Sequence, residues 1–180
     1  MTNASLPEEV EGPRVRLRRP ESSDAEFIFK AYAQDATVCR FLTWQPHKSV
    51  ATTREFITVC IEAWKSDARR PYVLAERSSS EAIGMIEART QRSTVELGYV
   101  LARLHWGKGL MAEAISLLAK ASLALPRIFR VQAFCDVENT QSQRVLEKAG
   151  LKCEGRLERW MVHPNLSPEP RPCFMYAVVK

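Results

Sequence analysis

The stretch that decides the fold class runs from Trp106 to Ala114 and reads Trp-Gly-Lys-Gly-Leu-Met-Ala-Glu-Ala. Two glycines at alternate positions separate a predicted strand from a predicted helix. Glycine lets the backbone turn sharply and approach a ligand closely. The free N–H groups at the start of a helix, with the helix dipole behind them, bind phosphate. The stretch therefore fits a phosphate-binding loop to which Lys108 adds a charge, and a loop that merely needs glycines for its turn is the alternative. Its spacing is neither that of a Walker loop nor that of a dinucleotide-binding fingerprint.

The hydrophobic pattern around this loop predicts an α/β (α+β) fold with a mixed, mostly antiparallel sheet flanked by helices. Strands are expected at 14–18, 72–76, 83–88, 95–101, 130–135, 158–162 and 173–178, with a turn at 78–80. The long apolar helix from Leu110 to Leu125 lies between two of these strands, so the three segments should form one parallel crossover. Gly98, inside a predicted strand, suggests a bulge.

Capping signals predict the remaining helices. Ser23 and Glu26 form a capping-box pattern, and Ser49 or Thr52 precedes a helical repeat that ends near Trp64. Asn139 is expected to cap a helix that ends at Gly150, a C-terminal glycine. The segments 41–48 and 163–172 are predicted to be loops.

Length and composition are typical of one globular domain. Of the 180 residues, 1–13 are predicted to be a loose leader and 14–180 the folded domain. No apolar run is long enough to span a membrane and the first eleven residues do not resemble a signal peptide, so we expect a cytoplasmic protein without a membrane partner. Oligomeric state is left open between monomer and homodimer.

The charge distribution argues against nucleic-acid binding, and the spacing of the cysteines and histidines argues against a metal site. The net charge is +5, but the positive side chains are spread out, and the densest group alternates along 14–19 as on a solvated strand face. Nucleic acid is therefore an unlikely partner. The five cysteines and three histidines have no metal-binding spacing, so no metal is expected.

The glycine loop and two other motifs resemble the GNAT superfamily of N-acetyltransferases. The general loop of that family reads Gln/Arg-x-x-Gly-x-Gly/Ala, from which Trp106 and Met111 depart. Trp-Gly-Lys-Gly followed by Glu-Ala instead resembles the ribosomal-protein (Rim-type) branch. The run from Asn139 to Leu151 is similar to the Asn-x-x-Ser…Lys-x-Gly-Phe element of that branch, and Phe41-Leu42-Thr43-Trp44 with Pro46 resembles its acceptor-side loop. The matches cover nearly the whole chain after residue 13.

The resemblance implies a GNAT fold and an enzyme that transfers an acetyl group from acetyl-coenzyme A (acetyl-CoA) to a primary amine. The acceptor is a protein N-terminus or a small molecule, and it attacks directly in a ternary complex. The positions implied to bind the coenzyme are Gly98, Tyr99, Val100, Trp106, Gly107, Lys108, Gly109, Leu110, Met111, Asn139 and Ser142.

Acetyl transfer to an amine requires removal of an amine proton, stabilisation of the thioester oxygen, and a proton for the leaving thiolate. Glu96 is the candidate base, because the family carries a carboxylate on this strand, and Glu87 is the second candidate. Ser142 is the candidate acid, with a plain first-turn serine as the equal alternative. A backbone N–H near Gly98 is the expected oxyanion donor. Trp44 is expected to touch the acceptor, together with Glu87, at an entrance between the loops 41–48 and 163–172.

Two other classes of function fit parts of the pattern. A non-catalytic acyl-CoA-binding module would keep the glycine loop and Asn139 but would need no base at Glu96. A basic protein associated with RNA or the ribosome would bind nucleic acid in a salt-dependent way and would not bind the coenzyme.

Overall fold

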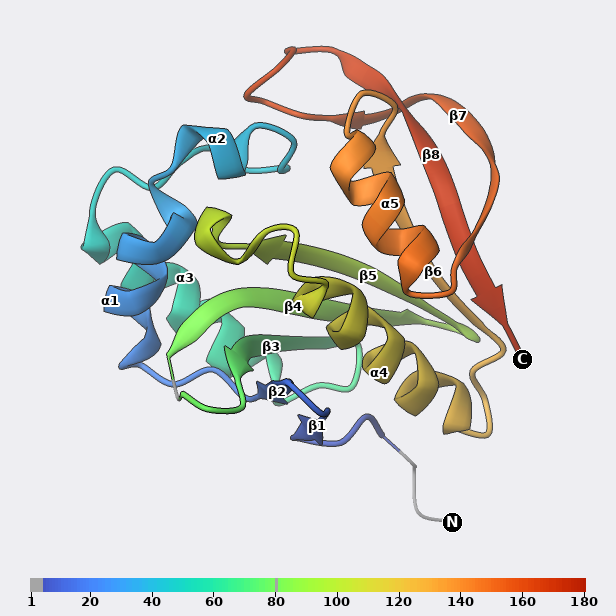
Figure 1. Cartoon of the computed structure of the whole chain (residues 1–180), viewed down its shortest axis with the longest axis horizontal. Coiled ribbons are helices and arrows are strands. Elements are labelled where there is room, and N and C mark those ends of the chain that lie inside the picture. The colour runs from blue at the N-terminus through green and yellow to red at the C-terminus, as the bar shows by residue number, and fades with distance from the viewer. Residues whose placement is uncertain (1–4, 80) are drawn as a thin grey trace.

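A computed structural model, which describes residues 5–79 and 81–180, shows one eight-stranded sheet with helices on both faces (Figure 1). The strands lie in the order β1-β2-β3-β4-β5-β6-β8-β7. Only β5 and β6 are parallel, and α4 connects them, which confirms the predicted crossover. The strands are β1 (Val10–Glu11), β2 (Val15–Arg18), β3 (Arg69–Glu76), β4 (Ala82–Gln91), β5 (Thr94–Leu101), β6 (Arg130–Asp136), β7 (Lys152–Val162) and β8 (Pro170–Val179).

The helices divide between the two faces of the sheet (Figure 1). α4 and α5 cover one face, whereas α1, α2 and α3 lie on the other side. None of the described helices is long and apolar enough to cross a membrane. The helical elements are α1 (Asp24–Ile28), the π-helical turn η1 (Phe29–Ala33), α2 (Ala36–Cys39), α3 (Val50–Ala63), the 3-10 turn η2 (Arg103–His105), α4 (Leu110–Ala124) and α5 (Thr140–Lys148).

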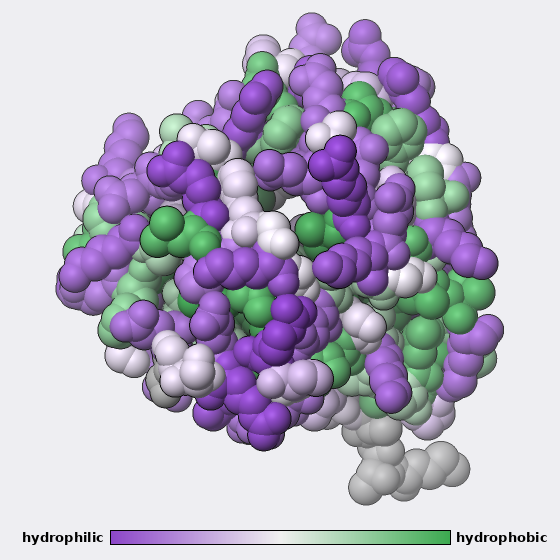
Figure 2. Space-filling model, viewed as in Figure 1, coloured by the Kyte–Doolittle hydropathy of each residue, from purple (hydrophilic) through white to green (hydrophobic). Residues whose placement is uncertain are grey.

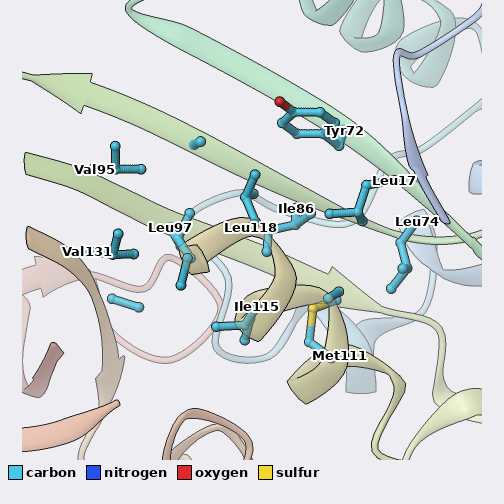
Figure 3. Close-up of a cluster of buried hydrophobic side chains, with 14 of the residues drawn as sticks. Leu17, Tyr72, Leu74, Ile86, Val95, Leu97, Met111, Ile115, Leu118 and Val131 are labelled. Atoms are coloured by element: carbon cyan, nitrogen blue, oxygen red, sulfur yellow. The ribbon is translucent and has the colours of Figure 1, made fainter. Parts of the chain in front are cut away.

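Helix α4 forms the larger hydrophobic core with the sheet (Figure 3). Its Ile115 and Leu118 are fully buried in a cluster that contains Val95 and Leu97 of β5. Full burial of such a side chain contributes about 1.5–3 kcal/mol. Since side chains alternate along a strand, the residues between and beyond these two, Glu96 and Gly98, point to the opposite face. That second face packs against α1 and α3.

Three predicted helix signals are confirmed in atomic detail. The Ser49 hydroxyl accepts a hydrogen bond from Thr52 N at 3.3 Å and caps α3. Asn139 Oδ1 accepts from Ser142 N at 3.1 Å and caps α5. Gly150 follows α5 with φ +93°, a left-handed conformation that glycine adopts at low cost.

The N-terminal predictions need two corrections. Residues 5–12 do not form a loose leader: β1 pairs with β2, Leu6 is 5% exposed within the core, and Tyr72 Oη donates to Pro7 O at 2.6 Å. The capping box is also wrong, because the Ser23 side chain caps nothing. Asp24, 3% exposed, instead accepts from Glu21 N and from Arg18.

Several elements are longer or shorter than predicted. β3 begins three residues earlier, at Arg69, and β7 begins six residues earlier, at Lys152. β7 is an edge strand whose residues are mostly exposed, so it lacks the alternation that reveals a strand in sequence. The short helix α2 lies just before the predicted loop 41–48, and Asp35 caps it. The end of the predicted turn 78–80 lies outside the described residues.

Candidate functional site

The site forms where β5 and β6 separate. These parallel strands pair only from Thr94–Arg130 to Glu96–Gln132. A cavity of about 930 Å³ occupies the gap beyond that point, and Figure 2 shows the hollow near the centre of the face viewed in Figure 1. Tyr99 lines the cavity from the α4 face of β5, and Gly98 from the opposite face. The cavity therefore reaches both faces of the sheet.

The predicted bulge at Gly98 is absent. β4 and β5 pair in unbroken register from Gly84–Leu101 to Gln91–Thr94, so Gly98 lies in a regular strand. The separation of β5 from β6 instead leaves backbone N–H groups near Gly98 unpaired, which is what the predicted bulge would have done. Backbone groups of residues 97–101 that face β6 have no pairing strand there, and such groups are available to hydrogen-bond a ligand.

The glycine loop has the geometry of an anion site. Gly107 and Gly109 have φ of +75° and +76°, and Gly109 is the N-cap residue of α4. No side chain caps this helix start. The first amides of α4 are therefore free to donate, with the helix dipole behind them. Leu110 and Met111, both buried, complete this wall of the cavity.

Arg14, the residue just before β2, holds the glycine loop in place through its side chain. Its guanidinium donates to Lys108 O at 2.9 Å and to Gly109 O at 3.4 Å. It also pairs with Glu113 of α4, whose carboxylate accepts from the backbone of Arg14 and Val15. Burial acts to raise the pKa of Glu113, but these hydrogen bonds outweigh it and hold the pKa below its ordinary value. Sequence reasoning placed Arg14 on a solvated face and missed this function.

Two side chains of the loop lie where the sequence did not place them. The Trp106 indole donates to Leu101 O at 2.8 Å, so it ties the loop to the end of β5. Lys108 is exposed and does not line the cavity. Lys148 of α5 takes that place: its Nζ lies 2.9 Å from where a Cβ on Gly109 would be. Arg144, one turn earlier on α5, also lines the cavity.

A short hydrogen bond joins β5 to α5 across the gap. Tyr99 Oη and Ser142 Oγ are 2.5 Å apart, and both residues line the cavity beside Asn139. Burial raises the pKa of Tyr99, so its hydroxyl stays protonated at neutral pH. The pair can thus hold a proton next to the cavity. The structure brings Tyr99, Asn139 and Ser142 together, as the sequence predicted for the coenzyme side.

The two candidate carboxylates occupy different surroundings on the opposite face. Glu87 lines the cavity, and arginines hold both of its oxygens: Arg89 Nε donates to Oε1 at 2.5 Å and Arg69 Nε to Oε2 at 2.7 Å. Glu96 lies beside the cavity rather than in its lining. Its Oε2 accepts from Gln132 at 3.0 Å, and its Oε1 lies 3.8 Å from Arg89 Nη1.

Aromatic residues and two loops close the cavity at the end near α2. Trp44 and Phe56 line it, and both rings pack against His47, with centroid distances of 5.0 and 5.8 Å. The two predicted loops are tied together by Asn165, which donates to Cys39 O at 2.7 Å and to Trp44 O at 2.8 Å. The two loops therefore lie side by side, and an acceptor entrance between them stays a prediction. Trp64 is a core residue at 5% exposure.

His163 is a buried residue that lines the cavity and to which the sequence analysis assigned no role. It is 2% exposed, with Nε2 at 3.9 Å from Asp136 Oδ2 and 3.7 Å from Cys173 Sγ. Arg171 holds the same carboxylate at 2.6 Å. Burial lowers the pKa of His163 below its ordinary value, although Asp136 acts to raise it. No spacing in the sequence indicates this cluster, because its members come from β6, β8 and the loop after β7.

Comparison with known proteins identifies the family. Residues 14–152 match the acetyltransferase (GNAT) domain. The chain belongs to the GNAT acetyltransferases. It is 32% identical over 153 residues to YjcK of Bacillus subtilis, named as a probable N-acetyltransferase, covering 81% of this chain and 84% of that one. It is 28% identical over 149 residues to the N-acetyltransferase p20 of Bacillus licheniformis, covering 80% and 82%.

Solved structures of GNAT acetyltransferases share the fold. A GNAT acetyltransferase from Bacillus anthracis superimposes with a TM-score of 0.83 at 24% identity, covering 95% of this chain and 98% of that one. RimL, a ribosomal-protein N-acetyltransferase, superimposes with a TM-score of 0.82 at 19% identity, covering 98% and 94%. The chain is thus an acetyltransferase with the single-domain GNAT fold. Among the described residues, no group of three or more His, Cys, Asp or Glu side chains is placed to hold a metal ion.

Proposed function

We propose that this acetyltransferase moves the acetyl group of acetyl-CoA to a primary amine by direct attack in a ternary complex. The observation that carries the proposal is the cavity that passes through the gap between β5 and β6. One end meets the glycine loop at the start of α4, and the other meets aromatic and charged side chains around Trp44. Two substrates bound at these two ends would meet at the gap, which favours reaction by proximity.

The residues of the α4 face fit a coenzyme with phosphate groups. The left-handed glycines leave the amides of the α4 N-terminus free, and Lys148 and Arg144 add positive charge beside them. Asn139 and Leu110 line the path from this loop to the gap. When bound, acetyl-CoA would supply the acetyl group as a thioester. Its carbonyl oxygen would lie near the unpaired backbone groups of β5, which supply the oxyanion donor.

Of the two carboxylates, Glu96 is the better base. Both oxygens of Glu87 already accept hydrogen bonds from arginines, whereas Oε1 of Glu96 accepts none from a described residue. Glu96 lies beside the cavity, so we propose that it takes the amine proton through a water molecule. The Tyr99–Ser142 pair, on the other side of the gap, holds the proton that the leaving thiolate needs.

The surroundings of Cys135 favour direct attack over a covalent intermediate. This cysteine lines the cavity beside Ser142, but it is 4% exposed and burial raises the pKa of its thiol to about 12. At neutral pH the thiol is therefore protonated and a poor nucleophile. The acceptor amine, a protein N-terminus or a small molecule, must then attack the acetyl group itself.

A thiol-release assay against short peptides and small amines tests the proposal. We expect coenzyme release that depends on an amine, and initial-velocity lines that intersect when both substrates are varied. Parallel lines would indicate a covalent intermediate and contradict direct attack. Coenzyme binding without release by any amine would indicate a non-catalytic binding module, and salt-dependent RNA binding without coenzyme binding would indicate the RNA-associated alternative.

A further inference from the structure

We infer that the acceptor amine carries a carboxylate, which Arg89 binds above Gly98 with Arg69 beside it. The inference rests on the proposed function and names the class of its second substrate: amino acids and similar amines with an apolar or aromatic part. Arg69 and Arg89 are direct neighbours on β3 and β4, and both line the cavity.

The acceptor end of the cavity has an excess of positive charge. Its charged lining residues are Arg40, Arg69, Arg89 and Glu87, and Glu96 lies beside the cavity at 3.8 Å from Arg89, so three arginines face two carboxylates. Much of the remaining wall at this end is apolar, with Trp44, Phe56, Met85 and Val38. A polyamine would bring further positive charge to this surface, whereas a carboxylate would complement it.

Arg89 is both anchored and free to bind. Its Nε donates to Glu87, which fixes the plane of the guanidinium, and Arg69 holds the other oxygen of the same carboxylate. Nη1 of Arg89 lies 3.8 Å from Glu96 Oε1, whereas Nη2 donates to no described residue and borders the space next to Gly98. A guanidinium whose plane is fixed in this way can offer the N–H groups of Nη2 to a carboxylate with little further ordering.

Gly98 keeps the space beneath Arg89 open. A Cβ built on this glycine would meet only Arg89 Nη2, at 3.8 Å, which is ordinary contact. Gly98 has no left-handed φ and no bulge, so its backbone conformation does not require glycine. The small residue instead leaves room between the strand and the guanidinium, next to the gap where the amine must react. The apolar part of the acceptor would then lie against Trp44 and Phe56.

Matched amines with and without a carboxylate test the inference. We expect phenylalanine to exceed phenethylamine in kcat/KM by at least about 10-fold, the low end of what a hydrogen bond to a charged group contributes. Because a carboxylate also changes the basicity of the amine, the decisive quantity is the ratio of kcat/KM for phenylalanine to kcat/KM for phenethylamine. We compare this ratio between wild type and each variant. Arg89→Gln should lower the ratio by about 10- to 100-fold. Arg89→Lys should retain part of it, since it keeps the charge but loses the planar fork.

Two further variants separate recognition from stability. Arg54→Gln is the matched control, because it removes one positive charge from the exposed face of α3, outside the cavity, and should leave the ratio unchanged. Gly98→Ala should raise the KM of phenylalanine at unchanged melting temperature. A ratio that stays at its wild-type value in Arg89→Gln, or a wild-type preference for phenethylamine, would overturn the inference.

A binding measurement distinguishes failure of this inference from failure of the proposed function. Calorimetry on the coenzyme-saturated protein should show 3-phenylpropionate binding at least about 10-fold more tightly than 3-phenylpropanol, and Arg89→Gln should abolish the difference. This result supports the carboxylate site even if no amine releases thiol. The absence of any preference, whether both bind equally or neither binds, overturns the inference even if neutral amines are acetylated.

Discussion

The two ends of the cavity are built by different means. The end of the cavity at the glycine loop, the proposed coenzyme end, is a backbone structure: two left-handed glycines and the first turn of α4 present amide groups, and Arg14 braces the carbonyl oxygens of the loop. The proposed acceptor end is a side-chain structure, in which rings and arginines come from α3, β3 and β4 and from the loops that follow α2 and β7. One continuous sequence motif marks the first end, whereas no continuous motif marks the second.

This difference predicts how each end responds to change. Substitutions at the coenzyme end should act through backbone conformation and should affect acetyl-CoA alone. Substitutions at the acceptor end should act through single contacts and should change the preference among amines. Residues at the gap between the ends should affect turnover rather than the binding of either substrate.

The largest effect on turnover is expected at the gap, from Glu96→Gln. General-base help contributes about 10²–10⁴-fold, so kcat should fall by an amount within or below that range while coenzyme affinity stays close to wild type. The deficit should shrink at high pH, where more of the amine is already neutral. A pH–rate profile with acetyl-CoA and the best amine acceptor measures both effects.

Glu87→Gln is the matched control for that experiment. It removes the carboxylate that orients Arg69 and Arg89, so the KM of the acceptor should rise by roughly 10-fold while kcat changes little. If Glu96→Gln turns over like wild type across the whole pH range, Glu96 has no part in proton transfer. If Glu87→Gln alone loses turnover, Glu87 is the base.

Trp44→Ala should have an intermediate effect, confined to the acceptor end. We expect the acceptor KM to rise by roughly 10-fold, from the loss of an aromatic wall, while the KM of acetyl-CoA is unchanged. Trp44 is only half-buried, so the melting temperature of the Trp44→Ala variant should fall little. Trp64→Ala is the contrast: this indole is 5% exposed, and truncation of a buried aromatic costs about 3–5 kcal/mol. A large loss of stability in Trp44→Ala with unaltered acceptor KM would mean that Trp44 packs in the core and does not bind the acceptor.

The smallest expected effect is a pH dependence of stability from His163. Burial holds its pKa below the ordinary value of 6.5, so the unfolded chain takes up a proton before the folded protein does. The stability that the neutral imidazole contributes is present above pH 6.5, and it falls as the pH drops below that value. Asp136 and the backbone of Leu42 and Phe41 favour the protonated ring, but burial, with Arg171 nearby, outweighs them.

Denaturant unfolding between pH 5 and 8 measures this effect. Wild type should lose more unfolding free energy than His163→Gln as the pH decreases. Parallel curves for the two proteins would show that the imidazole titrates alike in the folded and unfolded states, and they would remove His163 from the account.

The sequence predicted most of the fold because local rules determine most of its elements. The helical repeat of α4, the caps at Ser49 and Asn139 and the glycine after α5 each depend on neighbours within a few residues. The first six residues of β7 and all of α2 escaped prediction for a physical reason: an exposed edge strand has no alternating pattern, and a four-residue helix is too short to show a period. The misplaced capping box shows tertiary contacts overriding a local signal, because Arg18 and Asp24 anchor that segment instead.

The residues of the candidate site also divide into those that the sequence predicted and those that it missed. The glycine loop could be found from its local pattern, whereas Asn139, Ser142 and Tyr99 were named as coenzyme positions through the family resemblance. Arg14, Arg144, Lys148 and the Arg69–Glu87–Arg89 cluster were missed, since their importance depends on strand pairing and on which end of a helix faces the loop. The predicted bulge at Gly98 failed because separation of two strands, which no local pattern encodes, exposes the backbone instead.

Calorimetric titration with acetyl-CoA tests most directly that the start of α4 holds the coenzyme. Proline fixes φ near −65° and cannot adopt the left-handed conformation, so Gly107→Pro/Gly109→Pro should disorient the amides. Loss of two hydrogen bonds to a charged group predicts an affinity reduced by at least about 100-fold, in a protein that still folds. Gly155→Pro, at a positive-φ glycine on β7 outside the cavity, should bind acetyl-CoA like wild type. Unchanged affinity in the folded double variant would contradict the account.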